Sequence, residues 1–202
     1  MSSQTVVCRP GTPDTREEPP GRRGGRRRRH GRSHRRTVLV VLGALLAAYL
    51  AVTVAFFVNP PLGSVTHPQA VVVLDGYGNR DARAFAVARA AHVDTVAVSW
   101  PPYATCPSSQ AGLRVLCFVP KPASTRGEAL SVGRLARVHH WRSLLVVAGT
   151  TQIVRARLYL DHYFSGRLAF SGVDPTGITG WLYQIAYGQG GFVKALFCRG
   201  GC

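Results

Sequence analysis

The apolar and polar positions of the chain follow two different patterns, one on each side of residue 58. From Thr37 to Val58, 22 residues pass without a charged side chain. A helix that rises about 1.5 Å per residue would extend this run over roughly 33 Å, enough to cross the hydrocarbon core of a bilayer. The apolar core of a cleaved secretory signal is shorter, typically about 7–15 residues, and residues 53–55 match a cleavage site poorly. The pattern predicts one transmembrane helix.

Beyond residue 68, short apolar runs alternate with segments of helical periodicity. The runs are typical of buried strands and cover Ala70–Leu74, Asp94–Ser99, Val115–Val119, Ser143–Ala148 and Arg167–Ser171. The helical segments are Asp81–Ala91, Arg126–His139 and Gln152–Phe164. Alternating strands and helices indicate a mostly parallel sheet with right-handed crossovers. The predicted fold class is therefore α/β, a Rossmann-like three-layer domain preceded by the transmembrane helix.

The last segment, Thr179–Cys202, places four large aromatic side chains, Trp181, Tyr183, Tyr187 and Phe192, among glycines. Two interpretations are open. The segment is either a helix that packs on the edge of the sheet or an aromatic patch that contacts the membrane surface.

Composition divides the chain into four parts. Residues 1–36 have almost no large apolar side chains and are expected to form a disordered tail. Residues 37–58 are the predicted span, and residues 59–68, with three prolines, are expected to be a stiff linker. Residues 69–202, roughly 134 residues, are long enough for one domain with its own core.

Charge orients the predicted span. The tail holds 11 arginines against three acidic residues, a net charge of +8. Arginines beside one end of a span keep that end in the cytoplasm, so the protein is expected to be a single-pass protein of the cell membrane with residues 59–202 outside. The arginines would meet anionic lipid headgroups. No nucleic-acid partner is expected, because the tail has no aromatic side chain for base stacking.

Cysteine placement agrees with an external domain. Cys8 lies in the tail, whereas Cys106, Cys117, Cys198 and Cys202 all follow the span. An even number of external cysteines suggests disulfides, for which three pairings exist. The short segment between Cys106 and Cys117 favours a local bridge, and Cys198–Cys202 would close the C-terminus. These spacings are not specific for zinc, so no metal site is expected.

Ligands of open parallel sheets bind beyond the carboxyl ends of the strands. The loops of interest are therefore residues 75–80, 99–106 and 148–152. Gly76 and Gly78 permit positive φ and a close approach of the backbone to a ligand, although a tight turn alone would also use them. Asp75 is a candidate catalytic carboxylate at a strand end, or equally a turn residue.

Two predicted helix starts carry further candidates. Thr125 and Glu128 have the spacing of a capping box, with Thr125 at the N-cap, although Glu128 could instead face the pocket. Arg155 lies in the first turn of the next helix and shares a face with Gln152. A cation is unfavourable at that end of the helix dipole, which suggests an anionic partner. That partner is either a phosphate or carboxylate of a ligand, or a buried side chain such as Asp75 or Glu128.

Three segments resemble the YdcF/SanA/ElyC-like family of bacterial envelope proteins, in its actinobacterial, membrane-anchored form. They are Val-Val-Leu-Asp-Gly-Tyr-Gly at 72–78, Ser-Thr-Arg-Gly-Glu-Ala at 124–129 and Leu-Leu-Val-Val-Ala-Gly-Thr-Thr-Gln-Ile-Val-Arg-Ala at 144–156. The resemblance extends over residues 69–175. It implies a Rossmann-like fold and a role in maintenance of the cell envelope, and nucleotide or S-adenosylmethionine binding is associated with some members.

The chain departs from that family's pattern where chemistry would take place. Gln152 stands where the family has histidine, residues 148–149 replace a Thr-Ser pair, and Ser124 replaces an asparagine. Glutamine neither accepts nor donates a proton near neutral pH, as histidine can. The departure argues against a histidine-dependent activity.

Two functions remain open from the sequence. The first is a binding module for an anionic small molecule or a lipid-linked wall precursor, with ligand contacts from Gly76, Gly78, Arg80, Thr125, Gln152 and Arg155. The second is a hydrolase or transferase acting on such an envelope metabolite, with Asp75 or Glu128 as base and a nucleotide or S-adenosylmethionine as the cofactor that the resemblance suggests. The missing histidine favours the binding module.

Overall fold

The computed structural model describes residues 27–100, 106 and 112–197, with side chains from residue 34 onward. Residues 1–26 of the predicted tail, most of the 99–106 loop and the Cys198–Cys202 pair lie outside these ranges.

The apolar run forms a helix. Helix α1 spans Arg27–Thr53 and continues into a short π-helical segment, η1, at Val54–Val58. From His34 to Val58 the helix is long and apolar enough to cross a membrane, and its large apolar side chains are almost all exposed. The helix begins ten residues earlier than the apolar run, because arginine is a good helix former and propagation from an existing helix is easy.

Five parallel strands form the sheet, as the sequence predicted. They are β1 Ala70–Val73, β2 Thr95–Ser99, β3 Arg114–Phe118, β4 Ser143–Gly149 and β5 Arg167–Val173. Their order is β3-β2-β1-β4-β5. The central strands β1 and β4 are buried nearly throughout, which explains their continuous apolar runs.

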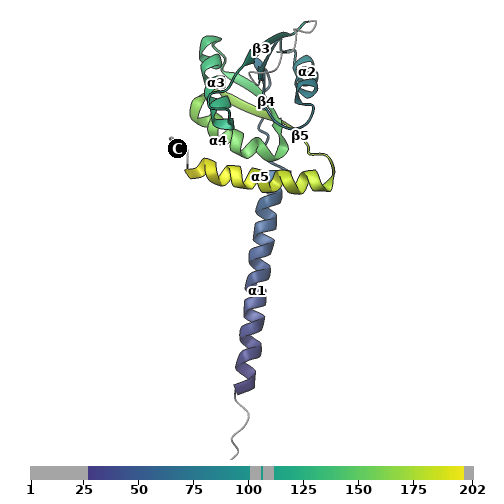
Figure 1. The fold of residues 1–202 in the computed structure, drawn as a ribbon, viewed down its shortest axis with the longest axis vertical. Helices are drawn as coiled ribbons and strands as arrows, with labels where there is room; N and C mark the ends of the chain where they lie inside the picture. Colours follow the sequence, from purple (N-terminus) through teal and green to yellow (C-terminus); the bar gives the residue numbers. More distant parts are fainter. Residues whose placement is uncertain (1–26, 101–105, 107–111, 198–202) are drawn as a thin grey trace, which may run out of the picture. The chain divides into compact units, whose positions relative to one another are not determined.

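Helices cover both faces of the sheet (Figure 1). Helices α3, Thr125–Val138, and α4, Ile153–Tyr163, pack on one face, where Val72, Leu144 and Leu160 belong to the same buried core. Helix α2, Arg80–Ala90, covers the other face through a second apolar cluster. The three-layer Rossmann-like architecture is therefore confirmed.

Strands β1 and β4 form the switch point of the sheet. They are parallel neighbours, with Val73 in register with Val147. The chain leaves β1 for α2 on one face, and leaves β4 through the 3₁₀ turn η2, Thr150–Gln152, for α4 on the other. Loops that diverge in this way open a crevice at the carboxyl edge, where open α/β sheets bind ligands.

The linker occupies the outer edge of the sheet. The Phe170 backbone N–H donates to the Leu62 carbonyl at 2.7 Å, and Arg157 Nη2 donates to the Pro61 carbonyl at 2.9 Å. The last helix, α5 at Gly177–Phe197, packs instead on α4, η2 and η1. Of the two interpretations of this segment, the one that predicted a helix is confirmed in that respect, but the linker, and not α5, lies against the edge strand β5.

The local disulfide is formed. Cys106 and Cys117 are bonded, with Cα atoms 6.0 Å apart. The bridge joins the segment after β2 to β3, as the spacing of the two cysteines predicted.

Candidate functional site

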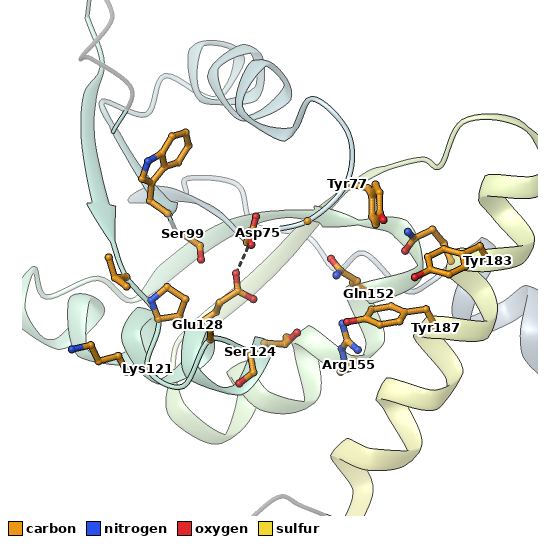
Figure 2. A pocket seen from close by; sticks show the side chains of 17 residues that line it. Asp75, Tyr77, Ser99, Lys121, Ser124, Glu128, Gln152, Arg155, Tyr183 and Tyr187 are labelled. Carbon is orange, nitrogen blue, oxygen red and sulfur yellow. Dashed lines mark hydrogen bonds between the residues drawn. The ribbon is translucent and has the colours of Figure 1, made fainter. Parts of the chain in front are cut away.

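A cavity of about 700 Å³ opens at the carboxyl edge of the sheet (Figure 2). Its walls come from the β1–α2 loop, the end of β2, the β3–α3 loop, the starts of α3 and α4, and α5. Its polar lining includes Asp75, Ser99, Lys121, Ser124, Glu128, Gln152 and Arg155. The volume is in the range of small-molecule sites.

Arg155 is a buried cation on helix α4. It is the third residue of α4 and only 8 % exposed. Its guanidinium lies over the Tyr187 ring, 5.3 Å from the ring centre. Its buried Nε has no hydrogen-bond partner, and among the described residues no carboxylate pairs with it. A buried charge without a partner is costly, and the Arg155 side chain lines the cavity, where an anion could reach it.

A glycine on helix α5 leaves space for the Arg155 side chain. A Cβ atom at Gly191 would overlap Nη1 of Arg155, whereas a Cβ at the neighbouring Gly190 would meet nothing within 4 Å. The glycine at 191 therefore allows α5 to lie directly over the guanidinium.

A second cavity of about 660 Å³ adjoins the first and shares Ser124, Arg155 and Tyr187 with it. It adds two cations, Arg126 and Lys194. Positive side chains from the β3–α3 loop, α3, α4 and α5 thus line one continuous region.

Glu128 turns into the site instead of capping its helix. The N-cap of α3 is Ser124, whose Oγ accepts from the Gly127 N–H at 3.3 Å, and Thr125 is the first helical residue. The predicted capping box with Thr125 at the N-cap was therefore wrong. Glu128 Oε1 accepts from the Asp75 backbone N–H at 2.6 Å, a contact between α3 and the loop after β1 (Figure 2).

Burial raises the pKa of the Glu128 carboxyl above its ordinary value of 4.5. The Asp75 amide, the nearby Ser99 hydroxyl and the Arg80 guanidinium act against this effect, while the Asp75 carboxylate adds to it. The buried Ser99 hydroxyl makes no hydrogen bond within the described residues, so its effect is that of a nearby dipole. A carboxyl with a raised pKa in a cavity is a candidate proton donor or acceptor.

Replacing Glu128 with glutamine should change how stability depends on pH. The native carboxyl holds its proton to higher pH than the unfolded one, so in the wild type this group makes stability fall as pH rises from about 4.5 through the raised pKa. Glu128→Gln keeps the acceptor for the Asp75 amide and removes the titration. We expect a shallower fall and no loss of stability at pH 7, measured by urea unfolding between pH 4 and 8. The remaining fall in stability comes in part from Asp81, because burial also raises the pKa of its carboxyl. If the free energy of unfolding depended on pH in the same way in the wild type and in Glu128→Gln, this expectation would be contradicted.

Arg80 holds the loop after β1. Its side chain is 5 % exposed and donates to the carbonyls of Leu74, Asp75 and Tyr77 at 2.7–3.0 Å. It also donates to Gln152 Oε1 at 2.8 Å, which joins this loop to the start of α4. Burial lowers the pKa of Arg80, and the Glu128 and Asp75 carboxylates offset part of this effect.

Only glycine fits at position 76, because the Arg80 side chain fills the space that a Cβ atom would occupy. Gly76 has a φ of 144°, and a Cβ atom there would lie 2.5 Å from Nη2 of Arg80. The turn therefore lies directly on a buried guanidinium, a use of glycine that the spacing alone did not suggest.

The sequence candidates divide between two cavities. Asp75, Gly76, Thr125, Glu128, Gln152 and Arg155 line the 700 Å³ cavity. Gly78 and Arg80 line a smaller one of about 350 Å³, next to Asp174, which accepts from the Thr150 hydroxyl at 2.5 Å.

In comparisons with protein-family models, curated proteins and solved structures, nothing matches this chain. Within residues 27–100, 106 and 112–197, no cluster of His, Cys, Asp and Glu could hold a metal ion.

Sequence reasoning did not select Lys121 or Lys194, and it named Tyr187 only as part of the aromatic C-terminal segment, yet all three line the cavities. One signal was present. The chain has only two lysines, at 121 and 194, among 25 basic residues, and both line the cation-rich region. No comparable signal marked Tyr187, because its role depends on how α5 lies over α4.

Proposed function

We propose that this protein is a membrane-anchored cell-envelope protein whose external domain binds an anionic ligand at the carboxyl edge of its sheet. The ligand class is a phosphate- or carboxylate-bearing small molecule, or the headgroup of a lipid-linked wall precursor. The observation that carries the proposal is Arg155, a buried guanidinium that no described carboxylate neutralises.

The surroundings of Arg155 support an anion rather than a neutral ligand. Lys121 lines the same cavity, and Arg126 and Lys194 line the adjoining one. Arginine binds phosphate and carboxylate oxygens through charge-assisted hydrogen bonds, and aromatic rings such as Tyr183 and Tyr187 add apolar walls.

Three features support the external location. The helix from His34 to Val58 suits a membrane span, and the 11 arginines of the tail precede it. The Cys106–Cys117 bridge fits an oxidising compartment. The resemblance of residues 72–78, 124–129 and 144–156 to the YdcF-like family adds the role in the cell envelope.

A second function, a hydrolase or transferase, is favoured by Glu128 alone. Its carboxyl lies in the cavity with a raised pKa and is held by the Asp75 amide. It would serve as the general base or acid for a ligand whose anionic group rests near Arg155.

Ligand titration of the full chain in detergent tests binding and separates the two functions. The probes are inorganic phosphate, pyrophosphate, ATP, S-adenosylmethionine and a short-chain isoprenyl pyrophosphate, with the melting temperature and heat of binding as readouts. A ligand present at about 100 times its Kd stabilises the folded protein by about 2.7 kcal/mol. Saturable binding without turnover supports the binding module, whereas consumption of the probe that Glu128→Gln abolishes supports the enzyme. A flat melting temperature for every probe would contradict both.

The orientation of the span is tested with reporters fused after Cys202. We expect alkaline phosphatase, which folds only outside the cytoplasm, to be active there, because arginines flank only the N-terminal side of the span. A cytoplasmic reporter at the same position should be inactive. The reverse pattern would place the domain inside the cell.

A further inference from the structure

Helix α5 presents one face to the domain and leaves the opposite face exposed and apolar. At about 100° per residue, Tyr183, Tyr187 and Lys194 share the side that lines the cavities. Residues spaced three or four apart form a stripe on the other side: Ile178, Leu182, Ile185, Gln189, Val193 and Leu196. Ile178 is 80 % exposed and Leu182 66 %, and Val193 and Leu196 are exposed as well, whereas Ile185 and Gln189 are half-buried.

The stripe has no charge. Helix α5 contains no acidic residue, and its one cation, Lys194, lies on the cavity side. A helix face that meets water is ordinarily polar, and a long apolar one marks a contact with lipid or with another protein.

Gln189, the one polar member of the stripe, indicates which contact applies. Its Oε1 accepts from the Tyr49 hydroxyl at 3.0 Å, and its Nε2 donates to Thr53 Oγ1 at 3.0 Å. Both partners belong to the apolar helix from His34 to Val58. At about 1.5 Å per residue, Tyr49 lies roughly 13 Å and Thr53 roughly 7 Å before its end.

Further contacts hold α5 against the C-terminal end of the apolar helix. Phe192 packs edge-to-face against Phe57, with ring centres 6.2 Å apart, and a Cβ at Gly188 would touch Phe57 at 3.2 Å. Residues 46–202 form one compact unit, so α5 and the end of the span belong to the same body.

We propose that α5 is an interfacial membrane helix, with its apolar stripe in the acyl-chain boundary of the outer leaflet and lipid as its partner. The inference rests on the membrane anchor proposed above, because the residues that bind Gln189 lie within the span. Lipid that surrounds residues 46–58 also meets the stripe, since the two surfaces are continuous through Gln189.

In this arrangement the cavity lies close to the membrane surface. Tyr183 and Tyr187 line it from the opposite side of the same helix, so the cavity lies roughly one helix diameter, about 10 Å, from lipid. A lipid-linked ligand could reach Arg155 with its tail still in the membrane.

Depth-dependent quenching tests the proposal on the full chain in phosphatidylcholine–phosphatidylglycerol vesicles. A fluorescent amino acid is placed singly at Leu182, at Val52 within the span, or at Arg134, which is exposed on α3. Lipids brominated in the acyl chains act as quencher. We expect quenching at Leu182 and Val52 to exceed that at Arg134 on the order of threefold, because acyl-chain bromines reach only side chains at or below the interface.

The Val52 position separates failure of this inference from failure of the anchor. Quenching at Val52 with none at Leu182 would overturn the interfacial helix and leave the anchor standing. Absence of quenching at both positions would overturn the anchor and the inference together. Emission at Leu182 that shifts to the blue with protein concentration, without quenching by lipid, would assign the stripe to a second copy of the chain and also overturn the proposal.

Discussion

Replacing Arg155 with alanine is expected to lower the affinity for the bound anion at least tenfold, with the fold retained. The lost charge-assisted hydrogen bond contributes about 1.5–3 kcal/mol. Because no described carboxylate pairs with Arg155, its removal leaves no buried charge unpaired. We therefore expect the free energy of unfolding to change by about 1 kcal/mol or less, the size of the lost contact with Tyr187. Calorimetric titration and urea unfolding of the same variant measure both quantities.

Arg134→Ala is the matched control, because it removes one positive charge from an exposed position on α3. Its affinity should equal that of the wild type. A large loss of stability in Arg155→Ala with unaltered affinity would refute the binding role and assign the guanidinium to the fold.

Two adjacent glycines, Gly190 and Gly191, provide a second test of the position of the Arg155 guanidinium. Gly191→Ala would push the Arg155 guanidinium aside, whereas Gly190→Ala meets nothing. Both changes favour the helix by up to about 1 kcal/mol. We expect only Gly191→Ala to weaken ligand binding, and equal affinities in the two variants would contradict the position assigned to Arg155.

Opening the disulfide is expected to lower the free energy of unfolding by about 3 kcal/mol, the usual effect of releasing a short closed loop in the unfolded chain. The bridge spans a sequence separation of 11 residues. Cys106→Ser suits the test because Cys106 is exposed, so the change leaves no cavity. Urea unfolding of the full chain in detergent measures the difference.

Dithiothreitol provides the control for the disulfide. The loss of stability on reduction should be larger in the wild type than in Cys106→Ser by the same amount, because a Cys198–Cys202 bridge would be opened in both proteins. Mass mapping of envelope material that finds Cys106 and Cys117 as free thiols would contradict the bridge itself.

The sequence alone determined the elements of the fold. Continuous apolar runs such as residues 70–74 and 143–148 became buried central strands, and the three helices predicted between the strands formed within one residue of their expected bounds, whereas the apolar N-terminal helix begins ten residues earlier than predicted. These features are readable because apolar periodicity is a property of neighbouring residues. The cavity at the carboxyl edge of the sheet was also expected from the sequence, since parallel strands that alternate with helices all end on the same side.

The roles of single side chains depended on the tertiary structure. Thr125 and Glu128 have a capping-box spacing, yet Ser124 caps the helix and Glu128 reaches the Asp75 amide. Local sequence could not distinguish these outcomes, because the second requires the loop after β1 to lie beside the start of α3. The same holds for Gly76, whose Cβ is excluded by Arg80.

The two features on which the proposals rest, Arg155 without a carboxylate partner among the described residues and the exposed stripe of α5, also depend on the tertiary structure. The charge pattern suggested an anionic partner for Arg155 and left a protein carboxylate as one choice. Only the arrangement of α3, α4 and α5 places Tyr187, and no carboxylate of the described residues, against the guanidinium. Likewise, the aromatic C-terminal segment suited either a sheet edge or a membrane surface. Only the tertiary structure shows that the linker lies against β5 and that Gln189 bonds to Tyr49 and Thr53, because these partners are distant in sequence. The contact of α5 with lipid is the proposal built on these contacts.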